Sequence, residues 1–364
     1  MKDISCFYKA QDRSVATHLA LSWKGTIRYT VPRDSIGQRA CWKVFKPGHL
    51  EIPLRAMARF PKLLSAVSCV EDENLAFIRR EIGSEAGLSC CRAGSAGVWQ
   101  KHTILLLNKT TAEPLYIVKA GFGAEVKSLL ENEAGWLSRL KGQPSLAPHI
   151  PELVAHHSRA DLCFVAQSVL SGKFEFKLGE SQLEFLRKLQ DSSLKSLRYE
   201  NSKLCRTMTW RLQELSGLLT PAWSARLNRG LERINQALSG HPIALVAAHR
   251  DFTPWNVRAE NGISKVFDWE FADTEQFPMI DPLHFALTPL ALKTRSTERL
   301  MNCIFDTLRL CQASFAAQFC YEAQAQALGY LISVCTFYLS SVKGNYETNP
   351  VLDSYALVID RLCA

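Results

Sequence analysis

One short segment combines residue types that could carry out phosphate chemistry. Residues 249–256 read HRDFTPWN and lie between an apolar run and a second run that ends in VFDWE. Asp251 supplies a carboxylate that could accept the proton of an attacking hydroxyl. Asn256 and Asp268 supply a neutral and a charged oxygen, and Mg²⁺ prefers oxygen ligands. Phosphoryl transfer from a nucleotide needs such a carboxylate and such metal ligands, so the segment predicts this chemistry.

A hairpin is expected to bring the two metal ligands together. Between Asn256 and Asp268 the sequence has two short strand-like runs around Asn261-Gly262, a dipeptide typical of a two-residue turn. Asn256 precedes the first strand and Asp268 follows the second. A hairpin brings these two positions together at its open end, so the ligands should lie close to each other. Pro254 should prevent the loop before them from continuing as a helix.

The pattern H-x-D-x-x-x-x-N, with an aspartate twelve residues after the asparagine, resembles the catalytic loop and metal site of the protein-kinase-like phosphotransferases. Thr253 and Glu270 stand where protein kinases carry a lysine and a glycine, and no Ala-Pro-Glu motif occurs. The pieces HRDFTPWNV, FDWEFA and DPLHFAL instead resemble the aminoglycoside phosphotransferase and choline kinase-like family, whose members phosphorylate small molecules. The resemblance covers about residues 87–345. It implies that Asp281 braces the catalytic loop. His249 is expected to lie beneath this loop and to bond its backbone or Asp281. Glu270 could contact a second metal through water or cap the next segment, and the cap is favoured.

The same resemblance implies a nucleotide-binding half. In YIVKA, Lys119 stands where the family has a strand lysine that contacts the nucleotide phosphates. The following helix, LLENEAGWLSRL, should carry its acidic partner. Glu125, Glu131 and Glu133 are the candidates, and Glu133 is preferred because the family pattern favours an acidic residue directly before Ala.

Two further pieces would complete the nucleotide site. AGSAG, residues 93–97, lies between two predicted strands, where Gly94 and Gly97 would let backbone N–H groups approach a phosphate. A plain hairpin turn explains these glycines equally well. FVAQSVLSGK is similar to the family's hinge, where backbone groups near Gln167 and Val169 would hold adenine.

The predicted fold class is α+β, a two-lobed protein-kinase-like fold. Strand patterns, one amphipathic helix and then a mostly helical region follow each other along the chain. We predict an N-terminal extension of unknown role, a small antiparallel β N-lobe with one helix that ends in the hinge, and a larger helical C-lobe with the catalytic loop and acceptor site. The corresponding ranges are 1–86, 87–170 and 171–364.

Composition limits the partners. All of the net charge of +8 comes from the first 110 residues, where basic residues are scattered as on a solvated face, so no nucleic-acid partner is predicted. The 12 cysteines include no CxxC pair, and the first residues mix charges, which favours reduced thiols and a cytoplasmic location. Residues 327–342 fall short of the roughly 20 apolar residues of a membrane span and predict a buried helix. The oligomeric state stays open.

The sequence therefore predicts an enzyme that uses ATP and Mg²⁺ to phosphorylate a hydroxyl of a small molecule. A sugar-like acceptor is favoured because it requires neither the acidic cleft of an aminoglycoside site nor the aromatic cage of a choline site. A catalytically silent nucleotide-binding module is the alternative from another class, and a protein kinase is a third interpretation. Candidate aromatic side chains for a cage are Trp255, Trp269, Phe271, Phe277, Phe285, Phe337, Tyr338 and Tyr346.

Overall fold

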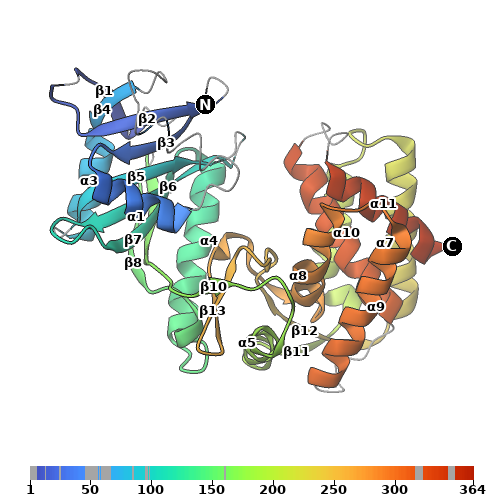
Figure 1. Ribbon diagram of the computed structural model, residues 1–364. Helices are drawn as coiled ribbons and strands as arrows, with labels where there is room; N and C mark the ends of the chain where they lie inside the picture. Colours follow the sequence, from blue (N-terminus) through green and yellow to red (C-terminus); the bar gives the residue numbers. More distant parts are fainter. Residues whose placement is uncertain are drawn as a thin grey trace. The chain divides into compact units, whose positions relative to one another are not determined.

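The chain forms two compact units (Figure 1). Unit 1 consists of residues 1–142 and 151–170, and unit 2 of residues 143–150 and 171–364. The computed structural model describes residues 6–12, 14–23, 26–45, 56, 58, 67–83, 86–94, 97, 99–159, 161–315, 323–342 and 349–364.

Unit 1 is built on a nine-stranded sheet with the order β1-β4-β2-β3-β5-β6-β7-β9-β8. Each neighbouring pair is antiparallel. The strands are β1 (Tyr8–Ala10), β2 (His18–Trp23), β3 (Thr26–Pro32), β4 (Val67–Glu71), β5 (Ala86–Ala93), β6 (Lys101–Asn108), β7 (Pro114–Gly121), β8 (Leu153–Ser158) and β9 (Cys163–Ser168). The helices are α1 (Ser35–Phe45), α3 (Glu73–Ile82) and α4 (Ala124–Lys141).

Both faces of this sheet are buried in its middle. Cys90 and Leu105 belong to one core, together with the buried side of α1. The next residue on β5, Cys91, and the preceding residue on β6, Ile104, belong to the other core, together with α3. Successive side chains of a strand point to opposite faces, so a strand covered on both sides becomes continuously apolar, as in the run ILLL of β6. The adjacent cysteines therefore lie on opposite faces, and both are free.

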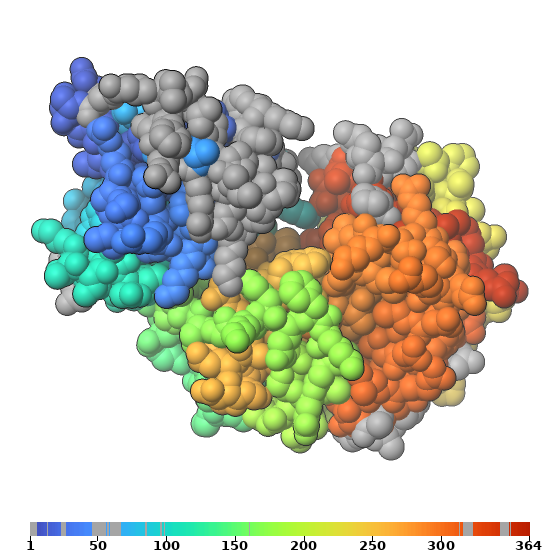
Figure 2. Space-filling model, viewed as in Figure 1, coloured from blue at the N-terminus to red at the C-terminus, as the bar shows by residue number. Residues whose placement is uncertain are grey.

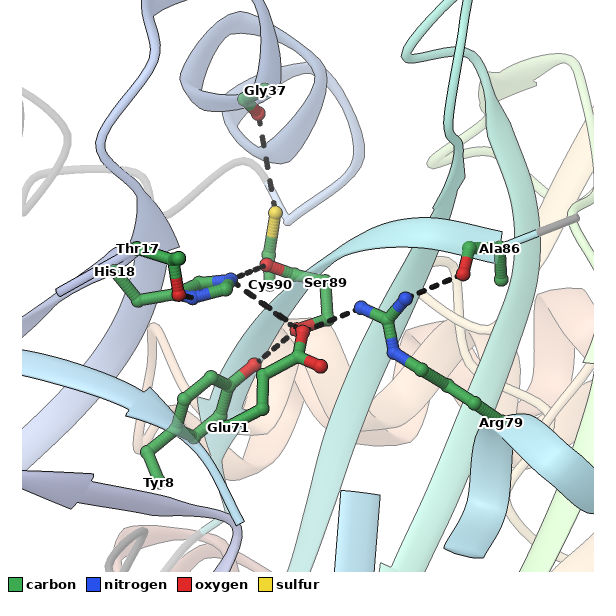
Figure 3. Close-up of polar contacts among 9 residues, drawn as sticks. All are labelled: Tyr8, Thr17, His18, Gly37, Glu71, Arg79, Ala86, Ser89 and Cys90. Atoms are coloured by element: carbon green, nitrogen blue, oxygen red, sulfur yellow. Dashed lines mark hydrogen bonds and ion pairs between the residues drawn. The ribbon is translucent and has the colours of Figure 1, made fainter. Parts of the chain in front are cut away.

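The N-terminal residues belong to the same sheet (Figure 1). A buried polar network joins them to β5 around the carboxylate of Glu71 (Figure 3). Glu71 Oε1 accepts hydrogen bonds from Ser89 Oγ at 2.7 Å and from Arg79 at 2.5 Å. Tyr8 Oη lies 2.6 Å from Ser89 Oγ, and His18 Nε2 lies 3.0 Å from the Ser89 carbonyl oxygen. Residues 1–86, predicted as an extension, thus supply strands and buried hydrogen-bonding partners to unit 1.

Unit 2 contains two three-stranded sheets and most of the helices. The sheet orders are β10-β13-β14 and β11-β12-β15. The strands are β10 (Lys173–Phe174), β11 (Lys195–Arg198), β12 (Pro242–Ala248), β13 (Val257–Glu260), β14 (Ile263–Val266) and β15 (Asp273–Gln276). The helices are α5 (Glu180–Asp191), α6 (Lys203–Glu214), α7 (Pro221–Leu238), α8 (Ile280–Ala291), α9 (Thr297–Ser314), α10 (Ala323–Val342) and α11 (Pro350–Cys363), with 3-10 turns η3 (Ala147–His149), η4 (Tyr199–Asn201) and η5 (Trp269–Phe271).

Helix α10 is longer than the sequence predicted. It begins at Ala323 and not at residue 327, and therefore has 20 residues. The predicted length, too short for a membrane span, is wrong. Among the described residues it is the one helix long and apolar enough to cross a membrane. Of its most apolar 18-residue window, 72% is buried inside the structure, as in the core helix of a folded domain.

Candidate active site

The candidate catalytic loop begins where a buried strand ends. Strand β12 is buried from Ile243 onward, and His249 follows it directly. The His249 ring lies beneath the loop: its Nδ1 accepts the backbone N–H of Asp251 at 3.2 Å, and its Nε2 lies 3.0 Å from the carbonyl oxygen of Phe267. A carbonyl oxygen only accepts, so Nε2 is the ring nitrogen that donates. His249 therefore holds the loop to the neighbouring strand end.

Asp281, at the start of α8, holds the backbone of the same loop. Its two carboxylate oxygens accept the backbone N–H groups of His249 at 2.7 Å and Arg250 at 2.8 Å. Arg250 has φ 66°, a left-handed conformation that a non-glycine residue rarely adopts without support. Asp281 is fully buried, and this burial raises the pKa of its carboxyl group, although the two N–H groups favour the ionised form.

Asp251 and Asn256 are directly bonded. The Asn256 side-chain nitrogen donates to the Asp251 backbone oxygen at 3.0 Å and to Asp251 Oδ2 at 2.8 Å. Both amide hydrogens are thereby used, which leaves the Asn256 side-chain oxygen for another partner. The Asp251 side chain is 25% exposed, so solvent can reach its carboxylate from outside the loop.

The predicted hairpin is confirmed and places Asp268 beside Asn256. Strands β13 and β14 pair around Asn261 and Gly262, which have φ values of 53° and 76°, as a type I′ turn requires. At the other end the Phe267 N–H donates to the Asn256 carbonyl oxygen at 3.1 Å, and Asp268 is the next residue. Asp268 itself has left-handed backbone angles, φ 74° and ψ 53°. Strained backbone of this kind gathers at functional sites.

The structure adds one residue that sequence reasoning missed. His284 is buried, and its Nε2 lies 3.3 Å from Asp251 Oδ1. On its other side, Nδ1 lies 3.2 Å from Tyr330 Oη and 3.3 Å from Thr288 Oγ1. Tyr330 Oη in turn lies 2.8 Å from Tyr355 Oη. Because a hydroxyl can donate to Nδ1, a neutral ring with its proton on Nε2 can donate to the carboxylate. Each Asp251 side-chain oxygen then accepts one hydrogen bond from the protein.

A sequence signal for this histidine was present. In DPLHFAL, His284 stands three residues after Asp281, which is about one turn of helix. Both side chains therefore project from the same side of α8 toward the loop that follows β12. The family resemblance includes the whole piece DPLHFAL, but it implies a role for Asp281 alone.

In unit 1, the predicted strand lysine has an acidic partner. Lys119 Nζ on β7 lies 2.5 Å from Glu133 Oε1 on α4, and both side chains are buried. The two competing residues are placed elsewhere. Glu131 is half exposed and accepts Ser158 Oγ at 3.0 Å, and Glu125 is exposed in the first turn of the helix. Of the three candidates, Glu133 is the one paired with Lys119.

The glycine turn and the hinge are described in part. A Cβ atom on Gly94 would lie 2.3 Å from the Lys101 carbonyl oxygen, so the strand pairing itself requires glycine there. Gly97 is exposed, but residues 95, 96 and 98 lie outside the described residues, so the phosphate-covering turn stays a prediction. Gln167 is buried on β9, and Val169 packs against the core on the α1 side of the sheet. Their role at adenine is likewise a prediction.

Comparison with known proteins agrees with this geometry. Residues 106–277 match the family model described as Phosphotransferase enzyme family. The apo form of a thermostable mutant of aminoglycoside phosphotransferase APH(4)-Ia is similar with a TM-score of 0.52 and 13% identity, covering 75% of this chain and 93% of that chain. Its ternary complex with ADP and hygromycin B gives a TM-score of 0.51 and 13% identity, covering 75% and 92%. No curated protein sequence matches the chain.

The chain therefore has the protein-kinase-like fold of these aminoglycoside phosphotransferase structures, mixed α+β, as predicted. Within this class the resemblance to the aminoglycoside phosphotransferases is confirmed, and residues 106–277 carry the pattern of the phosphotransferase family. The matched region includes Lys119, Asp251 and Asp268 but ends before Asp281 and His284.

Proposed function

We propose that this protein is a kinase that transfers the γ-phosphoryl group of ATP to a hydroxyl of a small molecule. The observation that supports the proposal most strongly is the setting of Asp251. Its carboxylate is held between Asn256 and His284 on a braced loop, yet it remains partly exposed. A carboxylate in this position can orient an incoming hydroxyl and accept its proton.

The donor set of the loop fits a magnesium ion. The Asn256 side chain donates both amide hydrogens to Asp251, so its side-chain oxygen remains for a cation. Asp268 is close to Asn256, because the residue before it, Phe267, donates its backbone N–H to the Asn256 carbonyl oxygen. One neutral and one charged oxygen suit Mg²⁺, which retains waters and phosphate oxygens as its other ligands. When bound, Mg²⁺ with ATP supplies the phosphoryl group and neutralises its charge.

In the reaction, Asp251 takes the proton of the acceptor hydroxyl. A bond forms between the acceptor oxygen and the γ-phosphorus, and the bond from that phosphorus to the bridging oxygen breaks, which leaves ADP. Asp251 Oδ1 and Oδ2 each accept one protein hydrogen bond, so the carboxylate cannot rotate freely and keeps a lone pair for the acceptor. Positioning of this kind supplies much of the catalysis in phosphoryl transfer.

Lys119 is proposed to bind the α- and β-phosphates, with Glu133 fixing its ammonium group. A buried lysine paired at 2.5 Å with a buried glutamate is held in one rotamer, ready to contact an anion. Gly94 and Gly97 would cover the phosphates, and backbone groups near Gln167 and Val169 would hold adenine. A cytoplasmic location remains a prediction from the sequence.

The test is transfer of label from [γ-³²P]ATP with Mg²⁺ to a pool of sugars, sugar acids, amino sugars, amino alcohols and aminoglycosides. We expect label in the small-molecule fraction, and a loss of at least about 1,000-fold for Asp251→Asn, which retains the shape but cannot accept the proton. A catalytically silent module would bind ATP without turning it over. Label found only on added protein substrates would instead indicate a protein kinase.

A further inference from the structure

Two arginines share one aromatic ring in unit 2, next to the candidate catalytic loop. The guanidinium carbon of Arg211, on α6, lies 5.4 Å from the centre of the Phe337 ring on α10. The guanidinium carbon of Arg250 also lies 5.4 Å from this ring centre. Phe271 meets the same ring edge-on at 4.9 Å. We call Arg211, Arg250, Phe271 and Phe337 the arginine cluster.

The carboxylates near the arginine cluster lie beside Arg250. Asp273 Oδ2 lies 3.9 Å from Arg250 and its Oδ1 lies 2.5 Å from Lys203, while Asp281 accepts the backbone N–H of Arg250. In the described part of the chain, no carboxylate lies within ion-pair distance of Arg211. Burial and the charge of Arg250 lower the pKa of Arg211 to about 10. A half-buried cation without a close counter-ion is costly, which is typical of groups that await a ligand.

The cluster includes one residue of the catalytic loop itself. Arg250 is the residue directly before Asp251, and its side chain faces Phe337. Tyr338 follows Phe337 on α10, with ring centres 5.9 Å apart. Burial raises the pKa of Tyr338, and the charge of Asp251 raises it further. A molecule whose hydroxyl reaches Asp251 would have other groups within reach of this surface.

The same contacts argue against a cationic acceptor. A cage for a quaternary ammonium needs free aromatic faces, but Phe337 already interacts with two guanidinium groups. Among the other predicted cage residues, Trp269, Phe277 and Phe285 are core side chains with almost no exposure, Tyr346 lies outside the described residues, and Trp255 is 40% exposed but is a single ring. The guanidinium group of Arg211 would also repel a polycationic aminoglycoside.

We propose that the acceptor carries an anionic group, a carboxylate or a phosphate, and that Arg211 binds this group while the acceptor hydroxyl faces Asp251. This inference rests on the proposed function, because it assigns the acceptor of that reaction. Arginine suits the task because its planar fork of N–H groups can donate two parallel hydrogen bonds to a carboxylate or phosphate.

The experiment compares four sugars that share one ring: glucuronate, glucose 6-phosphate, glucose and glucosamine. Binding is measured by calorimetry on the full chain with Mg²⁺ and a non-hydrolysable ATP analogue, so that no turnover is needed. Arg211→Met removes the charge but keeps an unbranched side chain to cover Phe337. The matched control is Arg206→Gln on the same helix, an exposed arginine that donates to the Asn201 backbone oxygen.

We expect at least one anionic sugar to bind about tenfold or more tightly than glucose, with glucosamine weakest. A preference for glucuronate indicates a carboxylate, and a preference for glucose 6-phosphate indicates a phosphate. Arg211→Met should reduce the preference to less than about threefold, and Arg206→Gln should keep it. Equal binding of the four sugars, including no binding of any, overturns the inference, as does a preference that survives Arg211→Met. Failure of the phosphotransferase proposal would appear separately, as an absence of ATP turnover.

Discussion

Asp281 holds the catalytic loop, so the substitution Asp281→Asn should strongly reduce both stability and activity. The wild-type carboxylate accepts two backbone N–H groups, from His249 and Arg250, in a fully buried place. An amide can accept only one of them and turns its NH₂ toward the other donor. A hydrogen bond to a charged group contributes about 1.5–3 kcal/mol, and a buried unsatisfied donor costs a similar amount. The easier burial of a neutral side chain offsets part of this loss.

We therefore expect the free energy of unfolding to fall by about 3 kcal/mol, which corresponds to a decrease of roughly 6–12 °C in Tm for a unit of this size. Displacement of the loop by even 1 Å should lower kcat by about 100-fold. Thermal unfolding followed by circular dichroism and an ATP turnover assay measure the two effects.

A surface pair provides the control. Asp306 pairs with Arg309 three residues later on α9, and both side chains are largely exposed. Asp306→Asn should change the free energy of unfolding by less than about 0.5 kcal/mol and leave kcat unchanged. If Asp281→Asn behaved like this control in both assays, the view that Asp281 holds the loop would be wrong.

The other predictions concern both units. Lys119→Met should abolish turnover and destabilise unit 1 by about 3–5 kcal/mol, because it leaves Glu133 buried without its cation. Adding Glu133→Leu should restore stability but not activity. Denaturant unfolding and turnover assays check both expectations. Removal of residues 1–86 should give an insoluble or unfolded protein, since β5 would lose its neighbour β3 and the hydrogen-bonding partners of Ser89. A soluble protein that unfolds cooperatively would show that the segment is dispensable. His284→Gln should lower kcat about tenfold or more with little change in the KM for ATP, because it disturbs one hydrogen bond to Asp251 and not the nucleotide; an equal loss through KM would contradict this role.

Contiguous motifs made much of the candidate site predictable. Asp251, Asn256 and Asp268 lie within 18 residues, and their relation depends on local geometry: a strand end, a tight turn and a hairpin that Asn-Gly specifies. Glu133 is preferred over its neighbours through the family pattern, and the structure supplies the physical reason. Helix α4 buries one side, and this side turns Glu133 toward the strand that carries Lys119.

What the sequence did not reveal depends on distant pairing. Strand β3 joins β5 through Tyr29 and Arg92, across a segment that contains helices α1 and α3 and strand β4, and no local pattern specifies such a partner. The contact of Arg211 with Phe337 brings together residues more than a hundred positions apart, which only the packing of α6 against α10 decides. Side-chain chemistry that depends on such contacts cannot be derived from spacing along the chain.

The central claim is that Asn256 and Asp268 hold the metal ion that accompanies ATP, within reach of Asp251. A crystal of the full chain grown with Mn²⁺ in place of Mg²⁺ and a non-hydrolysable ATP analogue would test it by anomalous scattering. We predict a manganese peak about 2.0–2.3 Å from the Asn256 side-chain oxygen and from an Asp268 carboxylate oxygen. Bound nucleotide with its metal peak away from both side chains would contradict the account.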